Sequence, residues 1–351
     1  MTKKREIPRA LIFGGIGCER EISVKSAEGL YGAIRSSGEN IFPAFIDPNG
    51  SWLLAKDENI SPASLANDPE ALADKVYPIR IGKEGGFSTG GNFIKIGVAI
   101  PILHGDFGED GRIQGALDTV GIPYVGCSVE TSAVCRNKSI LKSILKSHGI
   151  PMLDWVMIPK GDSLDTAISR AESALGYPMF VKPTSLGSSI GAGPARERSE
   201  LRQRLESARA VSDNVMIERC LVEKRELECA FFEYKGKRYF TNSGEIRYNS
   251  EFYDYESKYV LTDTEVMQVA DVGQVIRDRI RDISAMIADV VGLRHFARID
   301  FFLSHAGEVY FNEINTIPGL TSASLFPLMA KGAGVDLGEL FLDLSRAAQT
   351  K

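Results

Sequence analysis

Short apolar runs alternate with amphipathic stretches along the first hundred residues of the chain. The run at 10–15 (ALIFGG) predicts a strand, the apolar spacing over 23–36 predicts a helix, and the run at 41–46 (IFPAFI) predicts a second strand. Strands that alternate with helices in this way are typical of an α/β fold with a parallel sheet. We therefore expect an α/β domain of that kind at the N-terminus.

The alternation changes character between about residues 125 and 137. From that stretch on, the first alternation of strands and helices is replaced by a new set of elements, so we expect a domain boundary near residue 130 and an α+β arrangement in the C-terminal half. The elements predicted just after the boundary are helices at 137–148 and 163–175 and strands at 153–158 and 179–183.

Two strand-like runs near the C-terminus, FARIDFFL (296–303) and EVYFNEIN (308–315), are joined by a short turn. Runs of this kind predict an antiparallel hairpin. The register depends on the turn, and we assume that Leu303 and Glu308 close it. The cross-strand pairs expected from that turn are Asp300 with Phe311 and Arg298 with Glu313.

The polar side chains of this hairpin are expected to project to one face, because side chains alternate along a strand. Carboxylate and amide oxygens are the ligands that Mg²⁺ and Mn²⁺ prefer, so the face suits a divalent-metal site. From the hairpin alone, a cross-strand ion pair between Arg298 and Glu313 explains the pattern equally well. The polar face comprises Arg298, Asp300, Glu313 and Asn315, and the opposite, apolar face comprises Ile299, Phe301, Leu303, Tyr310 and Ile314.

A loop dense in glycine and serine follows a strand that ends near Lys182, in FVKPTSLGSSIGAG (180–193). Such a loop lets backbone N–H groups approach an anion, and the lysine supplies positive charge, which favours phosphate binding. A flexible linker is the alternative. The chain has no GxxxxGK[ST] loop, and GGIGCERE (14–21) has Arg20 where a dinucleotide fingerprint needs its third glycine, which argues against hydride chemistry.

Three further stretches carry polar residues in places where ligands bind. GGIGCERE sets Glu19 and Glu21 between a strand and a helix, and LHGDFGEDGRIQG (103–115) presents His104 in a similar loop. Solvated acids and a structural histidine are the alternatives. The stretch at 247–265, RYNSEFYDYESKYVLTDTE, mixes aromatic and charged residues and is interpreted either as a lid over the site or as packing against a neighbouring domain.

The composition is that of a globular protein: 351 residues, 44% hydrophobic and 25% charged, enough for two or three packed domains. A net charge of −5 gives no basic surface for nucleic acid, and no apolar run is long enough to span a membrane, so we expect neither as a partner. The five cysteines are scattered without CxxC spacing. That usage favours a reducing compartment, the cytoplasm, and argues against structural zinc.

Six separated motifs, taken together and in this order, resemble those of the D-alanine:D-alanine ligases of the ATP-grasp superfamily. The motifs are GGIGCEREIS, LHGDFGEDGRIQG, VKPTSLGSSIG, FYDYESKY, ARIDFF and FNEINTIPGLTSAS. The resemblance runs from about residue 10 to 335. It implies a Rossmann-like substrate-binding domain (1–130) and a two-subdomain ATP-grasp fold (131–224 and 225–351) with a substrate lid near 244–265.

The resemblance also implies an activity. Members of this family use ATP to join two D-alanine molecules through a D-alanyl phosphate, giving ADP and phosphate, in peptidoglycan precursor synthesis. ATP and two Mg²⁺ or Mn²⁺ ions are the implied cofactors, two D-alanine molecules the implied substrates, and a homodimer the implied assembly. The catalytic demand is fixed positive charge around developing oxyanions rather than a covalent nucleophile.

Roles pass by resemblance onto the matching positions of this chain. For the nucleotide they fall on Lys138 and Lys182 (phosphates), Gly187 and Ser189 (the glycine-rich loop), Glu218 and Glu226 (adenine and ribose) and Leu221 (adenine pocket), and for the metals on Asp300, Glu313 and Asn315. For D-alanine they fall on Glu19, His104, Ser188, Lys258, Tyr259, Arg298, Gly319, Ser324 and Leu325. Glu19, Ser188 and Tyr259 are implied to form a hydrogen-bonded chain, and Arg298 and the Gly319 N–H to stabilise the tetrahedral intermediate.

The sequence departs from the family pattern near Glu226, where Glu223-Lys224 stands in place of a frequent single glycine. The alternatives within the family are D-alanine:D-serine and D-alanine:D-lactate ligases, against which Leu325 and Tyr259 speak. A non-catalytic ATP-grasp module is the alternative from another class. Retention of the metal ligands, Arg298 and both phosphate lysines argues against it.

Overall fold

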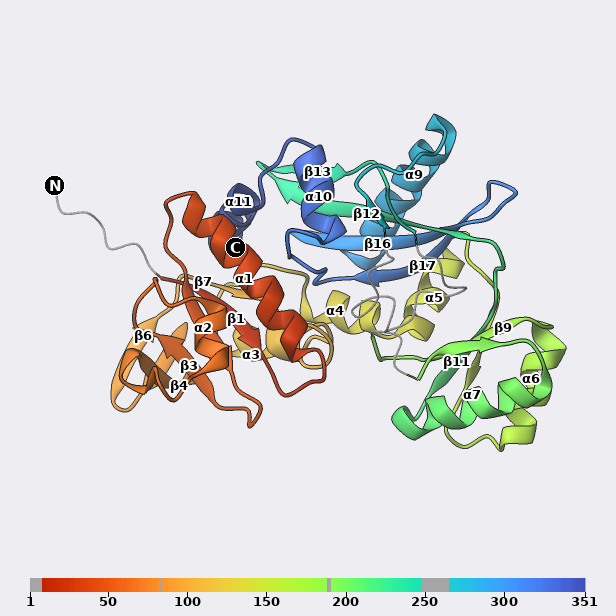
Figure 1. Cartoon of the computed structure of the whole chain (residues 1–351), viewed down its shortest axis with the longest axis horizontal. Coiled ribbons are helices and arrows are strands. Elements are labelled where there is room, and N and C mark those ends of the chain that lie inside the picture. The colour runs from red at the N-terminus through yellow and green to blue at the C-terminus, as the bar shows by residue number, and fades with distance from the viewer. Residues whose placement is uncertain (1–7, 83, 188–190, 248–264, 351) are drawn as a thin grey trace.

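A computed structural model describes residues 8–82, 84–187, 191–247 and 265–350 (Figure 1). Three sheets follow one another along the chain: a seven-stranded N-terminal sheet, a four-stranded central sheet and a six-stranded C-terminal sheet. Within the described part of the chain, no helix is both long and apolar enough to cross a membrane.

The N-terminal sheet is mixed rather than wholly parallel. Its strands are β1 (Arg9–Gly14), β2 (Phe42–Ile46), β3 (Trp52–Ala55), β4 (Val76–Gly82), β5 (Gly86–Thr89), β6 (Asn92–Lys95) and β7 (Val98–Pro101). They lie in the order β6-β5-β4-β3-β2-β1-β7, and only β1 pairs in parallel, with β2 and β7. The expectation of a parallel sheet is correct for these three strands and wrong for β3 to β6, which pair antiparallel. The connections β2–β3, β4–β5 and β5–β6 are too short for parallel crossovers.

Both faces of β1 are buried. The helices around this sheet are α1 (Arg20–Ser36), α2 (Pro62–Asn67), the short η1 (Ala73–Lys75) and α3 (Arg112–Val120), joined by α11 (Leu337–Gln349) from the other end of the chain. Leu11 and Phe13 pack with α1 and α11, whereas Ile12 packs with α3 on the opposite face. The run ALIFGG is therefore apolar throughout, as expected for a strand covered on both sides.

The central sheet is a small antiparallel layer, visible at the lower right of Figure 1. Its strands are β8 (Trp155–Ile158), β9 (Met179–Pro183), β10 (Gly193–Ala195) and β11 (Val215–Arg219), in the order β10-β9-β11-β8. Helices α6 (Leu164–Ala174) and α7 (Arg198–Val211) cover one face, while α4 (Val129–Arg136) and α5 (Lys138–Ser147) precede the sheet in sequence. The helix predicted at 137–148 and the strand at 179–183 agree with α5 and β9.

The C-terminal sheet has one apolar face and one divided face. Its strands are β12 (Arg225–Tyr234), β13 (Lys237–Phe240), β14 (Gly244–Arg247), β15 (Glu265–Met267), β16 (Phe296–Leu303) and β17 (Val309–Asn315), and its helices are α9 (Gln274–Val291) and α10 (Leu325–Gly332). Ile299 and Phe301 pack with α9 and α5 on the apolar face. On the other face Phe296 packs with α10 and α11, and the rest of that face carries polar side chains.

The hairpin β16–β17 forms, but its register differs from the predicted one. Asp300 pairs with Glu313 and Arg298 with Asn315, and the register shifts between Asp300 and Phe301, which pairs with Phe311. The turn is one residue tighter than assumed, since Ser304 N donates to Glu308 O. A β-bulge compensates for the tighter turn, and Glu313 and Asn315 still share the face of Asp300.

Tyr310 and Phe311 are the residues of this hairpin whose predicted sides are wrong. Phe311, expected opposite Asp300 on the polar face, pairs with Phe301 in the apolar core, and Tyr310 takes the other face. It pairs with Phe302, lies outside the hydrophobic clusters and donates its hydroxyl to Glu308 (2.5 Å). The tighter turn moves it to the face opposite Phe301, because the bulge lies beyond it along β17.

Candidate active site

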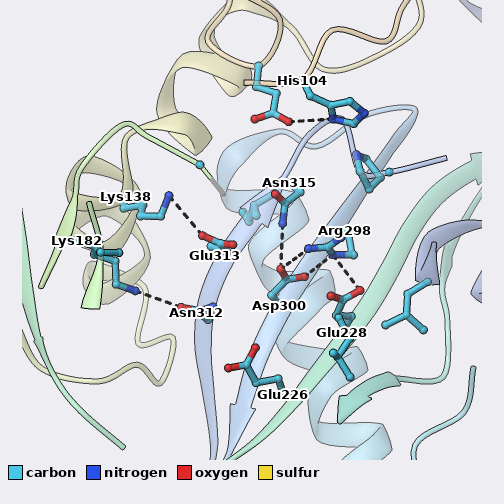
Figure 2. Close-up of a pocket in the computed structure, with 18 of the residues that line it drawn as sticks. His104, Lys138, Lys182, Glu226, Glu228, Arg298, Asp300, Asn312, Glu313 and Asn315 are labelled. Carbon is cyan, nitrogen blue, oxygen red and sulfur yellow. Dashed lines mark hydrogen bonds and ion pairs between the residues drawn. The ribbon is translucent and has the colours of Figure 1, made fainter. Parts of the chain in front are cut away.

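A cavity of about 590 Å³ lies where the three sheets meet, and Figure 2 shows its polar side chains. Every predicted site residue in the described part of the chain lines it. These residues are Glu19, His104, Lys138, Lys182, Gly187, Glu218, Leu221, Glu226, Arg298, Asp300, Glu313, Asn315, Gly319, Ser324 and Leu325. Ser188, Ser189, Lys258 and Tyr259 lie outside the described residues.

The carboxylate of Asp300 is the centre of the polar face. Arg298 donates to it twice, from Nε to Oδ1 and from Nη2 to Oδ2, both at 2.8 Å, and Asn315 Nδ2 donates to Oδ2 at 2.9 Å. The pKa of Arg298 is raised well above its usual value: burial acts against the charged form, but Asp300 and Glu228 outweigh it. A cross-strand Arg298–Glu313 pair was the alternative explanation to a metal site. In the structure Arg298 lies opposite Asn315 instead, and Glu313 lies opposite Asp300.

These residues fit a divalent metal. Asp300 and Glu313 face each other from adjacent strands, and Asn315, whose Nδ2 is engaged by Asp300, has an amide oxygen as a further donor. Hard oxygen donors are what Mg²⁺ requires. The set holds two carboxylates and one amide, which is consistent with the described residues containing no cluster of three or more His, Cys, Asp or Glu placed to bind a metal.

Two lysines face this acidic group across the cavity. Lys138 lies at the N-terminus of α5, where its Nζ is 3.4 Å from Glu313 Oε2 and donates to Leu186 O at 3.1 Å. Lys182 is the penultimate residue of β9, and its Nζ donates to Asn312 Oδ1 at 3.5 Å and pairs with Glu218. Both ammonium groups are thus held by anionic or carbonyl oxygens, the kind of atom that a phosphate would present.

Glu218 lies between two lysines. The carboxylate is almost fully buried and pairs with Lys142 and with Lys182. Burial alone would raise its pKa, but the two ammonium groups outweigh burial and hold the pKa down at about 2. Burial lowers the pKa of Lys142, with Glu218 opposing that shift. Lys182 lines the cavity, whereas Lys142 lies behind Glu218.

The far end of the cavity is apolar with one ion pair. Leu221 and Phe302 line it, and Lys224 Nζ lies 4.3 Å from the centre of the Phe302 ring. Lys224 also pairs with Glu226 at 3.1 Å, and Glu226 lies opposite Phe302 in the sheet. The extra residue in this stretch therefore leaves Glu226 facing the cavity.

The opposite end is formed by loops of the N-terminal sheet. Glu19 is the residue before α1, which begins at Arg20, so the predicted loop residue Glu21 belongs to the first helical turn instead. A side chain at Gly105 (φ 73°) would overlap the Glu19 carboxylate, so this close approach requires glycine. His104 Nε2 lies 2.9 Å from Ser26 Oγ, a hydrogen bond that fixes the ring beside the cavity.

The N-terminus of α10 completes the wall. Ser324 is the N-cap residue of this helix, and its hydroxyl shares a hydrogen bond of 2.8 Å with Thr321 Oγ1 rather than with the helix backbone. Leu325, the first helical residue, is buried. Gly319 lies against Ser324 Oγ. A helix N-terminus offers free N–H groups and a partial positive charge, which favour a carboxylate.

Several charged or polar residues of the cavity were not predicted from the sequence, among them Glu228, Arg136, Glu109 and Asn312. Glu228 shares its face of β12 with Glu226, a signal present in the alternation of RELECAFF. Arg136 and Glu109 pair at 2.9 Å. Arg136 ends helix α4 and Glu109 lies in a distant loop, so the pair leaves no local signal. Asn312 reaches Lys182 only because of the bulge.

Two family profiles together match most of the chain. The one described as "D-ala D-ala ligase N-terminus" matches residues 9–127, and the one described as "D-ala D-ala ligase C-terminus" matches residues 144–345. The D-alanine–D-alanine ligase of Caldicellulosiruptor bescii is 34% identical over 339 residues, covering 94% of this chain and 92% of its own. That of Synechococcus sp. (strain CC9605) is 35% identical, covering 96% and 97%.

Solved structures agree with the sequence matches. The D-alanine–D-alanine ligase of Coxiella burnetii superposes with a TM-score of 0.85 at 28% identity, covering 98% of this chain and 94% of its own. The D-Ala:D-Ser ligase VanG of Enterococcus faecalis superposes with a TM-score of 0.87 at 30% identity, covering 97% and 99%. Relatives that match across both halves of the chain, over one ATP-grasp fold, establish that this protein belongs to the D-alanine–D-alanine ligase family.

Proposed function

We infer that this protein is an ATP-dependent ligase that joins two D-alanine molecules into D-alanyl-D-alanine, releasing ADP and phosphate, for peptidoglycan precursor synthesis. One observation carries the inference most strongly. The acids Asp300 and Glu313 face Lys138 and Lys182 across one cavity, and an apolar end and a helix N-terminus also line it. Such a site can bring a nucleoside triphosphate and two small carboxylates together.

The reaction proceeds in two balanced steps. A carboxylate oxygen of the first D-alanine attacks the γ-phosphorus of ATP, and ADP leaves, which gives D-alanyl phosphate. The neutral amine of the second D-alanine then attacks the acyl carbon. Phosphate leaves as the amide bond forms, and the nitrogen gives up one proton to the departing phosphate or to solvent. Both transition states spread negative charge over oxygens, so the protein contributes positioning and electrostatic stabilisation.

The residues of this chain divide that work. We propose that Lys138 and Lys182 bind the ATP phosphates, and that Leu221, Glu218 and Glu226 hold the adenosine end. Metal ions held by Asp300, Glu313 and Asn315 would neutralise phosphate charge when bound. Lys138 and Lys182 are already paired with Glu313 and Glu218, so phosphates would replace those carboxylates as partners. The glycine-rich loop with Gly187 and Ser189 would cover the phosphates.

The substrate end follows the same logic. We propose that Glu19 binds the ammonium of the first D-alanine near His104, and that Arg298 and the N–H of Gly319 stabilise the tetrahedral oxyanion. Ser324, at the N-terminus of α10, would receive the carboxylate of the second D-alanine. Ser188, Lys258 and Tyr259 are proposed to act from the loop and lid, as the family motif implies.

We further propose residues 1–130, 131–224 and 225–351 as the three domains, a homodimer as the assembly and the cytoplasm as the location. All five cysteines are free thiols, which supports a reducing compartment. Neither nucleic acid nor membrane is proposed as a partner, in line with the net charge of −5.

D-serine and D-lactate are the competing second substrates, and VanG, a D-Ala:D-Ser ligase, has the same fold. Leu325 supports D-alanine, because a buried leucine beside Ser324 offers no polar partner to a serine hydroxyl. D-lactate has a hydroxyl group where D-alanine has an amine. It therefore competes best with D-alanine in a site that disfavours binding of the amine. Tyr259 is neutral near pH 7 and adds no positive charge against the amine.

Product analysis tests the proposal. The protein is given ATP, Mg²⁺ and equimolar D-alanine, D-serine and D-lactate at several pH values, and products are identified by mass spectrometry. We expect D-alanyl-D-alanine to dominate at pH 7.5. A dominant D-serine or D-lactate product would overturn the substrate assignment, and failure to release ADP in the presence of D-alanine would favour a non-catalytic module.

A further inference from the structure

Glu228 is a third carboxylate on the polar face, and the scheme above gives it no role. Strand β12 sets Glu228 directly opposite Asp300, and β17 sets Glu313 on the other side of Asp300. The three acids therefore form one row across three adjacent strands, with Glu228 at the end of the row away from the lysines (Figure 2). Glu228 is only 4% exposed, and a carboxylate buried to that degree needs a cation close by.

That cation is Arg298, which Glu228 shares with Asp300. The guanidinium makes two hydrogen bonds to Asp300, and its Nε lies 3.0 Å from Glu228 Oε2. Nε carries one hydrogen, which points to Asp300 Oδ1 in this arrangement. Glu228 is thus already at contact distance, and a small movement of Arg298 would transfer that hydrogen bond to it.

A bound metal would engage only one of the two carboxylate partners of Arg298, namely Asp300, and would leave Glu228 available. Both carboxylate oxygens of Asp300 accept hydrogen bonds from Arg298. The same carboxylate is proposed to hold metal, so a bound metal ion and the guanidinium compete for it. Arg298 must nevertheless stay in the cavity to stabilise the oxyanion. The competition costs less where a second carboxylate is ready to receive the guanidinium.

We propose that Glu228 is a positioning residue that takes over Arg298 when Asp300 binds metal. By doing so it strengthens metal binding and holds the guanidinium in place for the second step. The inference rests on the proposed function, because it uses the metal role of Asp300. It assigns Glu228 an action through Arg298 and no contact with substrate.

A simpler explanation would be the negative charge itself, since any nearby carboxylate attracts a cation through space. Two substitutions separate the explanations. Glu228→Asp keeps the charge but withdraws the carboxylate from Arg298 by one methylene, whereas Glu228→Gln keeps the size and removes the charge. A through-space effect would leave Glu228→Asp like the wild type.

Binding of Mn²⁺ measures the effect without turnover. The full chain is saturated with a non-hydrolysable ATP analogue, without D-alanine, and free Mn²⁺ is followed by electron paramagnetic resonance. We expect Glu228→Asp to weaken Mn²⁺ binding about 10-fold, as loss of a residue that orients a metal ligand commonly does. Wild-type affinity in Glu228→Asp would overturn the proposal.

Glu245→Asp is the matched control. Glu245 is an equally buried acid of the same sheet, pairs with Arg225 and Arg247, and does not line the cavity. Its shortening should change Mn²⁺ affinity less than about 2-fold, because it shares no partner with Asp300. A loss as large as that of Glu228→Asp would show a general effect of buried acids and overturn the proposal.

A double-mutant cycle with Arg298→Met tests the route of the effect. If Glu228 acts through Arg298, either Glu228 substitution should weaken Mn²⁺ binding less than about 2-fold in the Arg298→Met background. Equal losses in both backgrounds would overturn the proposal, and Glu228→Gln supplies the comparison if Glu228→Asp does not fold. Failure of the ligase function is seen separately, as absence of ADP release by the wild type with D-alanine.

Discussion

Glu313 lies directly opposite Asp300, and this pairing depends on one extra residue in β17. Phe301 pairs with Phe311 and Asp300 with Glu313, so Asn312 lies between the two registers. Without the shift, Asn312 would face Asp300, and Glu313 would turn toward α9 and the apolar core. The bulge thus keeps both acids on the face that meets the lysines.

Glu313→Gln should abolish most activity and leave the fold intact. The substitution keeps the size of the side chain but removes a charge that faces Asp300 and pairs with Lys138. We expect turnover to fall by two orders of magnitude or more, about the effect of losing a metal ligand. Turnover is measured against Mg²⁺ concentration, with Glu308→Gln in the turn of the same hairpin as the control. Near wild-type turnover at limiting Mg²⁺ would rule out the metal role.

Lys182→Met should weaken ATP binding more than D-alanine binding. Lys182 lies near the end of β9, and its ammonium faces the cavity. Burial acts to lower the pKa of Lys182, but Glu218 outweighs burial and raises it, so the side chain stays charged at neutral pH. A point charge facing the phosphates is lost while the loop backbone is kept. Calorimetry of both ligands tests this, with Lys160→Met, an exposed lysine, as the control. Unchanged nucleotide affinity would reject the role.

Lys142→Met should destabilise the fold more than it affects phosphate binding. Lys142 and Lys182 both pair with the buried carboxylate of Glu218. Removing Lys142 would leave Glu218 with Lys182 as its one remaining lysine partner. Breaking a buried pair costs about 3–5 kcal/mol. Lys146→Met on the same helix removes only an exposed partner of Asp154 and should cost about 0–1 kcal/mol. Denaturant unfolding of both variants gives the comparison, and equal losses would contradict it.

The same buried carboxylate predicts how stability depends on acid. Glu218 has a pKa of about 2 in the folded protein, against 4.5 for the unperturbed group. A lowered folded-state pKa stabilises the protein above pH 4.5, and this contribution is lost as the pH falls from 4.5 toward 2. In Lys142→Met the folded-state pKa should rise, so this part of the acid loss should shrink. Unfolding free energies measured between pH 6 and 3 test the difference.

Much of the site could be predicted because several of its residues lie in short segments whose residue types and periodicity indicate a function. Lys182 precedes a glycine-rich loop, and Asp300, Glu313 and Asn315 follow the alternation of two strands, so residue type and period suffice. Their loops marked Glu19 and His104 as candidates, and the family resemblance gave them a substrate role and added Ser324. No local pattern indicates that these three residues converge. The structure brings all of them to one cavity.

What the sequence did not predict depends on distance in the chain or on single-residue irregularities. Lys142 meets Glu218 across 76 residues, and Arg136 meets Glu109 across 27, so neither contact has a period. The tighter turn at Ser304 and the bulge at Asn312 each shift the register by one residue, and the two shifts were not separable from alternation alone. The antiparallel half of the N-terminal sheet was missed because short strands of either direction look alike.

Gly29→Ala should disturb the active site from the back of helix α1. A Cβ at Gly29 would lie 2.5 Å from the carbonyl oxygen of Leu320, in the loop that carries Gly319. That loop is held on α1, since Leu320 N donates to Ser26 Oγ at 3.3 Å. The added methyl must push the loop away, which we expect to cost about 1–3 kcal/mol and to lower kcat by displacing the Gly319 N–H from the oxyanion position.

Gly32→Ala, one turn further along the same helix, separates packing from helix propensity. A Cβ there meets no atom within 4 Å, so the substitution should stabilise the protein by about 0.5–1 kcal/mol and leave kcat unchanged. Denaturant midpoints and kcat are measured for both variants. If Gly29→Ala matched Gly32→Ala in stability and in rate, the loop would have to move without cost, and the position of the Gly319 N–H would not depend on its contact with α1.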